Sequence, residues 1–175
     1  CDKFAEAGCI SSVDKNNQPH SRFVNFKYFF EDNLVFFSNY ESHKAQNFID
    51  NDKVCVNFWW PNIEVQVRIE GIISKCEEKF SDEHFESRKP AKNVAALVSE
   101  QSKKIESYDL LKQKYEAMKE RIENGEDVNS RPKNWGGYQI KVHFFEFWEA
   151  NDDRLNYREC YEKNDESWSK YFLQS

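Results

Sequence analysis

The sequence predicts a mostly antiparallel β protein with attached helices. Three observations lead to this fold class. Strand-like runs fill the first half of the chain, helical periodicity is confined to the middle, and strand patterns return after Trp135. The order of a β-meander, then helices, then strands favours an antiparallel β-barrel that carries helices.

The first half of the chain consists of strand patterns separated by turns. The cluster 15–20 is rich in turn-forming residues, and residues 31–33 form another turn signal. Val65, Val67 and Ile69 alternate with polar residues, which is typical of a strand with one buried and one solvated face. The predicted strands are residues 8–14, 21–29, 34–39, 53–60 and 63–74.

Helical patterns occupy three places. Ser42 is a plausible N-cap for a short helix, and residues 81–83 suit the first turn of a helix that reaches about Arg88. A longer helix is expected before Gly125, which would stop it. We expect its apolar stripe to belong to the core; the stripe consists of Leu111, Tyr115, Met118 and Ile122.

The last part of the chain returns to strands at residues 135–150, 154–163 and 168–173. At 175 residues the chain is most simply one domain, residues 1–175. A domain of this size buries about two-thirds of its unfolded surface. The 5 Gly and 4 Pro residues argue against a disordered or fibrous chain.

Charge and hydropathy restrict the partners. The net charge of −6 makes a nucleic-acid role unexpected, because an acidic protein is repelled by phosphates unless it has a local basic patch. No apolar run approaches 18 residues and no secretory signal is recognisable, so we expect no membrane span and a cytoplasmic location. The chain opens with Cys1, not Met, which leaves open whether residues precede it.

Metal and disulfide chemistry are not expected. The 5 Cys residues are odd in number, and no CxxC pair occurs, so reduced and mostly buried thiols fit better. The 4 His residues lack the spacing of metal ligands, and we predict no metal site. The phosphate-loop, nucleophile-elbow and dinucleotide-binding motifs are also missing from the sequence.

Cations at a helix start raise the question of an anion. His43 and Lys44 stand in the first turn after Ser42, where the unpaired N–H groups and the helix dipole already favour negative charge. Either an anion such as phosphate binds there, or Lys44 is a solvated surface residue. Arg22 and Lys27 share one strand and would lie on opposite faces unless a bulge intervenes.

Six motifs identify a family that the chain resembles. In order they are SRFVNFK, FFSNYESHKA, EVQVRIEG, FESRKPAKNVAALVSEQS, WGGYQI and FEFWEANDDRLNYR. The chain resembles the pyridoxine (pyridoxamine) 5′-phosphate oxidases, FMN-dependent enzymes of vitamin B6 metabolism and pyridoxine biosynthesis, from about Gly8 to the C-terminus.

The resemblance implies an FMN-binding split β-barrel that forms a homodimer, with FMN bound where two subunits meet. A C-terminal region of about 134–175 would serve dimerisation and the substrate pocket. The implied FMN-binding residues are Arg22, Lys27, Phe37, Ser38, His43, Lys44, Gln66, Gln101, Ser102, Trp148 and Arg158.

The implied substrate pocket departs from the family pattern. His84 stands where the family has Tyr, Lys92 where it has Ser, and Asn156 where it has His. The family also has an N-terminal segment that helps to cover the substrate, and we expect that segment to be absent here. The implied substrate-binding residues are Lys27, His84, Arg88, Lys92, Arg154 and Asn156, and Arg154 and Asn156 would be catalytic.

The expected function is therefore an FMN-dependent oxidase that converts pyridoxamine or pyridoxine 5′-phosphate to pyridoxal 5′-phosphate and reduces O2 to H2O2. Two alternatives remain at this point. One is an FMN-dependent oxidoreductase of the same fold with another substrate, and the other is a non-catalytic flavin- or pyridoxal-phosphate-binding protein. The expected partners are a second copy of the chain and a phosphorylated small molecule.

Overall fold

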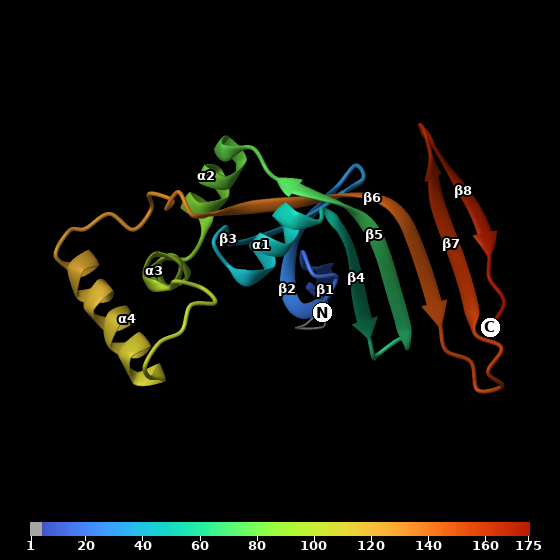
Figure 1. Cartoon of the computed structure of the whole chain (residues 1–175), viewed down its shortest axis with the longest axis horizontal. Helices are drawn as coiled ribbons and strands as arrows, with labels where there is room; N and C mark the ends of the chain where they lie inside the picture. The colour runs from blue at the N-terminus through green and yellow to red at the C-terminus, as the bar shows by residue number, and fades with distance from the viewer. Residues whose placement is uncertain (1–4) are drawn as a thin grey trace. The chain divides into compact units, whose positions relative to one another are not determined.

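The computed structural model describes residues 5–175 (Figure 1). The strands are β1 (Ala7–Val13), β2 (Pro19–Phe30), β3 (Asn33–Asn39), β4 (Lys53–Trp60), β5 (Val65–Lys75), β6 (Trp135–Glu149), β7 (Tyr157–Asn164) and β8 (Ser167–Phe172). The helices are α1 (His43–Asp50), α2 (Glu78–Ser87), α3 (Pro90–Val98) and α4 (Tyr108–Glu123).

The strands form one antiparallel barrel with an extension. Their order is β3-β2-β1-β4-β5-β6-β7-β8, and β6 also pairs with β3, so the first six strands of this order close on themselves. Strands β7 and β8 continue from β6 as a hairpin. The predicted fold class, an antiparallel β-barrel that carries helices, is confirmed. Closure leaves these six strands without a free edge.

The chain divides into two compact units, each of which is described separately. The first unit comprises the chain up to Phe36, Asn47–Ser74 and Gln139–Ser175, and it holds most of the barrel. The second unit comprises Phe37–Gln46 and Lys75–Tyr138, and it holds α2, α3 and α4. The prediction of one domain over residues 1–175 stays a prediction.

Alternation along β5 positions two kinds of side chain. Val67 and Ile69 are buried, whereas Arg68 and Glu70, which alternate with them, are half-buried. The period-2 pattern thus predicted this strand correctly, because successive side chains point to opposite faces. The same strand approaches β6 closely at Gly71, where a Cβ atom would lie 2.6 Å from the backbone oxygen of Lys141.

The predicted end of the long helix is confirmed. Gly125 follows α4 with a φ of 99°, in the left-handed region that glycine adopts without strain. Its N–H donates to the carbonyl of Ile122, and the N–H of Glu126 donates to that of Arg121, which satisfies two carbonyl groups of the last turn. At the other end, the Ser107 hydroxyl accepts from the N–H of Leu110 as an N-cap.

The expectation that the α4 stripe is core is wrong. None of the α4 residues is buried, and the four apolar residues of the stripe are half-buried. Helix α4 packs against α3, where the Tyr115 hydroxyl donates to the carbonyl of Ala91. Contact with one short helix covers only part of an amphipathic face, so periodicity gave the helix but not its degree of burial.

Helix boundaries around Pro90 also differ from the prediction. Helix α2 begins at Glu78 rather than near residue 81, and it ends at Ser87. Arg88 caps α2 in an extended conformation, and Pro90 opens the separate helix α3. Proline is well suited to a first helical position, and it disfavours a helical conformation in the residue before it, so the chain breaks here.

A register shift in β2 lies between Phe26 and Tyr28, so the bulge that the Arg22–Lys27 spacing left open is present at Lys27.

Among the described residues, Cys9, Cys55, Cys76 and Cys160 are free thiols, the last two buried and the others half-buried. Cys1 lies outside the described residues. No helix in residues 5–175 has the length and apolar character needed to span a membrane.

Candidate active site

Lys44 in the first turn of α1 is buried, with only 8% of its surface exposed. Its Nζ atom donates to the hydroxyls of Ser38, at 3.0 Å, and Ser42, at 3.3 Å. Hydroxyl groups carry no formal charge, so these contacts do not neutralise the ammonium. The reading of Lys44 as a solvated surface residue is therefore wrong. His43 beside it is exposed.

Ser42 precedes α1, as predicted for its N-cap, but its hydroxyl has a different use. The hydroxyl donates to the carbonyl of Asn39 at 2.8 Å and accepts from Lys44. Ser42 is completely buried and Ser38 nearly so, with 0% and 6% of their surfaces exposed. The two serines thus fix Lys44 at the positive end of the helix dipole, where an anion is favoured.

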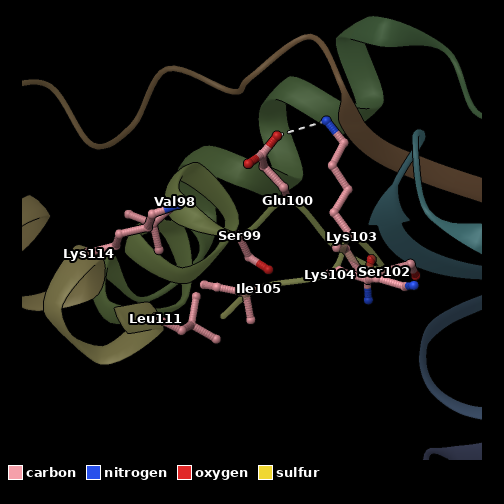
Figure 2. Close-up of a pocket in the computed structure, with 10 residues that line it drawn as sticks. Val98, Ser99, Glu100, Ser102, Lys103, Lys104, Ile105, Leu111 and Lys114 are labelled. Carbon is pink, nitrogen blue, oxygen red and sulfur yellow. Dashed lines mark hydrogen bonds and ion pairs between the residues drawn. The ribbon is translucent and has the colours of Figure 1, made fainter. Parts of the chain in front are cut away.

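Gln101 joins this cluster from the loop between α3 and α4. Its Oε1 atom accepts from the Ser38 hydroxyl at 3.1 Å and from the N–H of Asn39 at 3.3 Å. Ser102 follows with a positive φ of 74°. This loop and the start of α4 enclose a cavity of about 220 Å³, in which Lys103 pairs with Glu100 (Figure 2).

Arg22 in the first unit is a second cation with neutral partners. Its guanidinium donates to the Ser12 hydroxyl at 2.8 Å, and more weakly to the carbonyl of Ile10 at 3.4 Å. The side-chain amide of Asn47 donates to the same hydroxyl at 3.1 Å. Burial lowers the pKa of Arg22, which shows that desolvation disfavours its charge. An anion would compensate it.

Lys27, at the bulge in β2, lies near a carboxylate instead. Its ammonium pairs with Glu6, and the side chain lines an apolar cavity of about 360 Å³ together with Phe26 and Phe58. The predicted roles of Lys27 toward FMN and toward substrate both stay predictions. In either role the ammonium would leave Glu6 and contact a group of FMN or of the substrate instead.

An aromatic stack occupies the second unit. The Phe37 and His84 rings are stacked with centroids 3.6 Å apart and an interplanar angle of 8°. The centroid of the Trp135 ring is 5.4 Å from that of Phe37, and the two rings are nearly parallel. The Phe80 ring is also stacked on Phe37, with centroids 6.0 Å apart. The structure therefore brings the predicted residues Phe37 and His84 into direct contact.

Arg88 lies beside this stack. Its guanidinium carbon is 4.4 Å from the centroid of the Trp135 ring, and its Nη2 atom donates to the carbonyl of Lys92 at 2.9 Å. Its Nη1 atom is buried without a hydrogen-bond partner, and burial lowers the pKa of Arg88. A buried unpaired N–H group is costly, which makes this atom a candidate anion donor.

Lys92 does not share a helix face with Arg88, although it follows four residues later in the chain. Arg88 ends α2, whereas Lys92 lies in α3, beyond the break at Pro90. The Arg88 side chain contacts the backbone of Lys92, whose own side chain is exposed. A role of Lys92 toward the substrate stays a prediction.

Arg158 on β7 belongs to a buried cluster with a carboxylate. Glu146 on β6 is 3% exposed, and its two carboxylate oxygens accept from Arg158 and from Arg68 on β5. Burial raises the pKa of Glu146, but the hydrogen bonds from the two arginines outweigh this effect and hold the pKa below its usual value. Arg68 also pairs with Glu70.

Two further predicted residues of the first unit, Trp148 and Gln66, lie on strands that also hold this cluster. Trp148 is the cross-strand partner of Arg158, and its ring is 6.5 Å from that of Trp59. Gln66, which pairs with Trp59 across β4 and β5, is half-buried. Trp59 is half exposed, at 52%, so its ring is accessible to solvent.

Arg154 and Asn156 lie in the loop between β6 and β7. Arg154 is exposed and has a positive φ of 64°, a conformation that costs free energy for a side chain with a Cβ. The side-chain oxygen of Asn156 accepts from the N–H of Asn151 at 3.1 Å, which closes the loop. Asn156 therefore shapes the turn that presents Arg154.

The predicted residues fall into two groups. The second unit contains Phe37, Ser38, His43, Lys44, His84, Arg88, Lys92, Gln101 and Ser102, and the first contains Arg22, Lys27, Gln66, Trp148, Arg154, Asn156 and Arg158. Contacts within each unit link Lys44 to Gln101 through Ser38, and Arg158 to Glu146. Sequence reasoning missed Glu146, Arg68 and Trp135; a lone carboxylate between Phe145 and Phe147 was the available signal.

Two family models match the chain. The model of pyridoxamine 5′-phosphate oxidase matches residues 3–121, and that of the pyridoxine 5′-phosphate oxidase C-terminal dimerisation region matches residues 135–175. The chain belongs to the pyridoxamine 5′-phosphate oxidase family. Like its family, the chain is an FMN-dependent oxidoreductase, and FMN is its cofactor.

Curated relatives agree with this assignment. The chain is 37% identical over 168 residues to a pyridoxine/pyridoxamine 5′-phosphate oxidase of Colwellia psychrerythraea, covering 96% of this chain and 76% of that protein. It is 40% identical over 164 residues to pyridoxine/pyridoxamine 5′-phosphate oxidase 2 of Hydrogenovibrio crunogenus, covering 94% of this chain and 76% of that protein.

Solved structures of similar fold include PhzG from Burkholderia lata, in complex with tetrahydrophenazine-1-carboxylic acid. It has a TM-score of 0.90 and 22% identity, covering 99% of this chain and 84% of that chain. A pyridoxamine 5′-phosphate oxidase-related, FMN binding protein from Nostoc punctiforme has a TM-score of 0.82 and 17% identity, covering 99% and 90% of the two chains. At these identities the likeness supports the fold.

The residues present fit the FMN phosphate. Lys44 is a buried cation whose hydrogen bonds described above go to the hydroxyl oxygens of Ser38 and Ser42. Such groups gain the most from a dianion, since a charge-assisted hydrogen bond is about twice as strong as a neutral one. The start of α1 adds backbone N–H groups and the positive end of its dipole.

Proposed function

We propose that the protein is a homodimeric FMN-dependent oxidase that converts pyridoxamine or pyridoxine 5′-phosphate to pyridoxal 5′-phosphate. The observation that carries the proposal is the buried Lys44 at the start of α1, held by two serine hydroxyls. Relatives named for this reaction cover nearly the whole chain, and the match to a dimerisation region supports the homodimer. Free thiols among the described cysteines agree with a cytoplasmic location.

Within this proposal each group of residues has a task. Lys44, Ser38 and Gln101 hold the FMN phosphate, with His43 and Ser102 beside them, and Arg22 is a separate FMN contact in the first unit. Phe37 provides a flat apolar surface, and Gln66, Trp148 and Arg158 contact the flavin ring system. These roles use what the side chains offer: charge-assisted donors for the phosphate, and stacking and amide contacts for the planar ring.

Arg88 holds the substrate phosphate. Its buried Nη1 group has no hydrogen-bond acceptor, and its guanidinium lies over the Trp135 ring. His84, one helical turn earlier on α2, lies on the adjoining aromatic stack, and Lys92 contributes further positive charge. Lys27, in the first unit, is a separate substrate contact. Arg154 and Asn156 act at the reacting end of the substrate, where Asn156 fixes the loop that presents Arg154.

The chemistry that FMN supplies when bound is two-electron oxidation of the substrate coupled to reduction of O2 to H2O2. Pyridoxine phosphate loses two electrons and two protons at its alcohol carbon. Pyridoxamine phosphate loses the same, and water then replaces the nitrogen, which leaves as ammonia. The protein binds, orients and excludes bulk water, and no side-chain nucleophile is required.

The proposal is tested by mixing the FMN-loaded protein with pyridoxamine 5′-phosphate in the absence of oxygen. We expect the yellow colour to bleach once, with one pyridoxal phosphate formed per flavin, and to return when O2 is admitted. A protein that keeps its FMN but is not bleached by either B6 phosphate would contradict the proposed substrate, while its membership of the family would stand.

A second candidate function is oxidation of a different substrate on the same scaffold. The specific observation in its favour is the engagement of the Asn156 side chain with Asn151, which ties an amide into the loop at the reacting end of the pocket. An amide does not titrate near neutral pH, whereas an imidazole does. Bleaching by another planar, anionic reductant, but by neither B6 phosphate, would select this candidate.

A further inference from the structure

A buried carboxylate connects three neighbouring strands of the first unit. Glu146 lies on β6, between Arg68 on β5 and Arg158 on β7. Its Oε2 atom accepts from Arg68 Nε at 2.9 Å and Nη2 at 2.8 Å, and its Oε1 atom accepts from Arg158 Nε at 2.7 Å and Nη2 at 2.6 Å. Each arginine therefore presents the Nε–Nη2 edge of its guanidinium to one carboxylate oxygen.

This arrangement fixes the direction of the Arg158 side chain. Its Nη1 atom donates to the carbonyl of Gln174 at 3.1 Å, so the guanidinium is held from two sides. Three of its five N–H groups are used in this way, and two remain for a further acceptor. A planar fork held at two points loses little additional freedom when it binds a ligand.

The position of Glu146 in the sheet explains why it controls Arg158. Glu146 pairs with Cys160 across β6 and β7, and Trp148 pairs with Arg158, so the carboxylate and the guanidinium are diagonal neighbours. With 3% of its surface exposed, Glu146 has little water to compete for its oxygens. Arg158 is 29% exposed and can reach a ligand.

We infer that Glu146 is a positioning residue for cofactor binding: its carboxylate holds the Arg158 guanidinium in the orientation that contacts FMN. The inference rests on the proposed function, in which Arg158 is an FMN contact. Arg68 on the opposite side serves to anchor the carboxylate. Loss of Glu146 therefore weakens FMN binding through Arg158.

A glutamine at this position separates the roles. An amide has one acceptor oxygen and one donor group, so Glu146→Gln leaves one arginine facing N–H groups instead of an acceptor. The isosteric size keeps the packing of the strand. In Glu146→Asp the charge is retained on a shorter side chain, so we expect an FMN affinity between those of wild type and Glu146→Gln.

The experiment is a double-mutant cycle on FMN affinity, read from the quenching of flavin fluorescence when FMN is added to apoprotein. We expect Glu146→Gln and Arg158→Gln each to weaken binding on the order of ten- to a hundredfold, as for a hydrogen bond to a charged group. The double variant should bind no more weakly than Arg158→Gln alone. The matched control Glu162→Gln, at an exposed carboxylate of β7 outside this cluster, should change the affinity about twofold or less. Circular dichroism establishes that each variant is folded, and Glu146→Asp replaces Glu146→Gln if the latter is not.

Additive losses in the double variant would overturn the inference, as would a Glu162→Gln loss equal to that of Glu146→Gln. A Glu146→Gln variant that melts earlier but keeps its FMN affinity would show a structural role alone and would equally overturn it. Wild-type apoprotein that fails to bind FMN would contradict the cofactor role itself and is thereby distinguished from these outcomes.

Discussion

The Nζ atom of Lys44 lies 3.0 Å from the hydroxyl oxygen of Ser38, although Lys44 is only 8% exposed and stands in the first turn of α1. A buried cation at the positive end of a helix dipole is unfavourable in isolation. The arrangement becomes favourable when a dianion binds there, which is the role proposed for the FMN phosphate.

Replacement of Lys44 by Ala should separate binding from stability. We expect FMN affinity to fall by about 1–3 kcal/mol, the range for hydrogen bonds to charged groups, while the melting temperature of the apoprotein does not fall. Fluorescence titration and thermal melts measure the two effects. Lys53→Ala, at an exposed lysine that starts β4, is the control and should alter neither. An apoprotein that melts earlier with unchanged FMN affinity would make Lys44 a structural residue.

Arg88→Ala should act on the substrate and not on the cofactor. Because the Nη1 donor of Arg88 is buried and unpaired, a phosphate would remove an existing cost as well as add an ion pair. We expect the KM for pyridoxamine phosphate to rise at least about tenfold with FMN affinity unchanged, in steady-state assays. The neighbouring exposed Lys89→Ala is the control. Equal effects of both substitutions would indicate only general electrostatic attraction.

Asn156→His should raise kcat/KM for pyridoxamine phosphate. The ring nitrogen Nδ1 of histidine can occupy the place of the amide oxygen and accept from the N–H of Asn151, so the loop is retained. The imidazole adds a group that titrates near neutral pH. Steady-state rates across pH 6 to 9 would show the gain as a new titration. A slower enzyme with an unchanged pH profile would argue that the site suits another substrate.

Gly71→Ala should destabilise the barrel. A Cβ atom there would lie 2.5 Å from Cγ2 of Ile140 and 2.6 Å from the backbone oxygen of Lys141, and a backbone atom cannot move aside cheaply. We expect a loss of about 1–3 kcal/mol in the free energy of unfolding, measured by denaturant titration. Ser74→Ala on the same strand, at an exposed position, should cost far less. Equal stability of the two variants would mean that β5 and β6 are further apart than described.

The Glu146 cluster should make stability sensitive to acid. The pKa of Glu146 lies below its ordinary value because the hydrogen bonds from Arg158 and Arg68 outweigh the effect of burial. A lowered pKa contributes stability above the ordinary pKa of about 4.3, and this contribution is lost as the pH falls through the folded-state pKa. The melting-temperature gap between wild type and Glu146→Gln should therefore stay constant from about pH 7 to 5 and shrink below about 4.3. A gap that widens in acid would contradict this sign.

Local patterns predicted the elements well. The alternation around Val65, Val67 and Ile69 gave β5, and Gly125 marked the end of α4, because both signals depend on neighbouring residues only. Burial of the α4 stripe failed as a prediction, because it depends on what packs against the helix. Periodicity says which face is apolar, and tertiary structure decides how much of it is covered.

The site was predicted in part. The cations at the start of α1 were visible in sequence, but the burial of Lys44 by Ser38 and Ser42 was not. The link between Arg68 and Glu146 joins residues 78 positions apart, which no local pattern reveals. The break at Pro90 was visible, and it separates Arg88 from Lys92 by the restriction that proline places on the residue before it.

The most direct test of the account is the yield of peroxide per pyridoxal phosphate formed by the purified protein with FMN, pyridoxamine 5′-phosphate and O2. The account predicts sustained turnover that depends on FMN, with one H2O2 and one ammonia released per pyridoxal phosphate. FMN bound in full, with neither pyridoxal phosphate nor peroxide formed from pyridoxamine or pyridoxine phosphate, would contradict it.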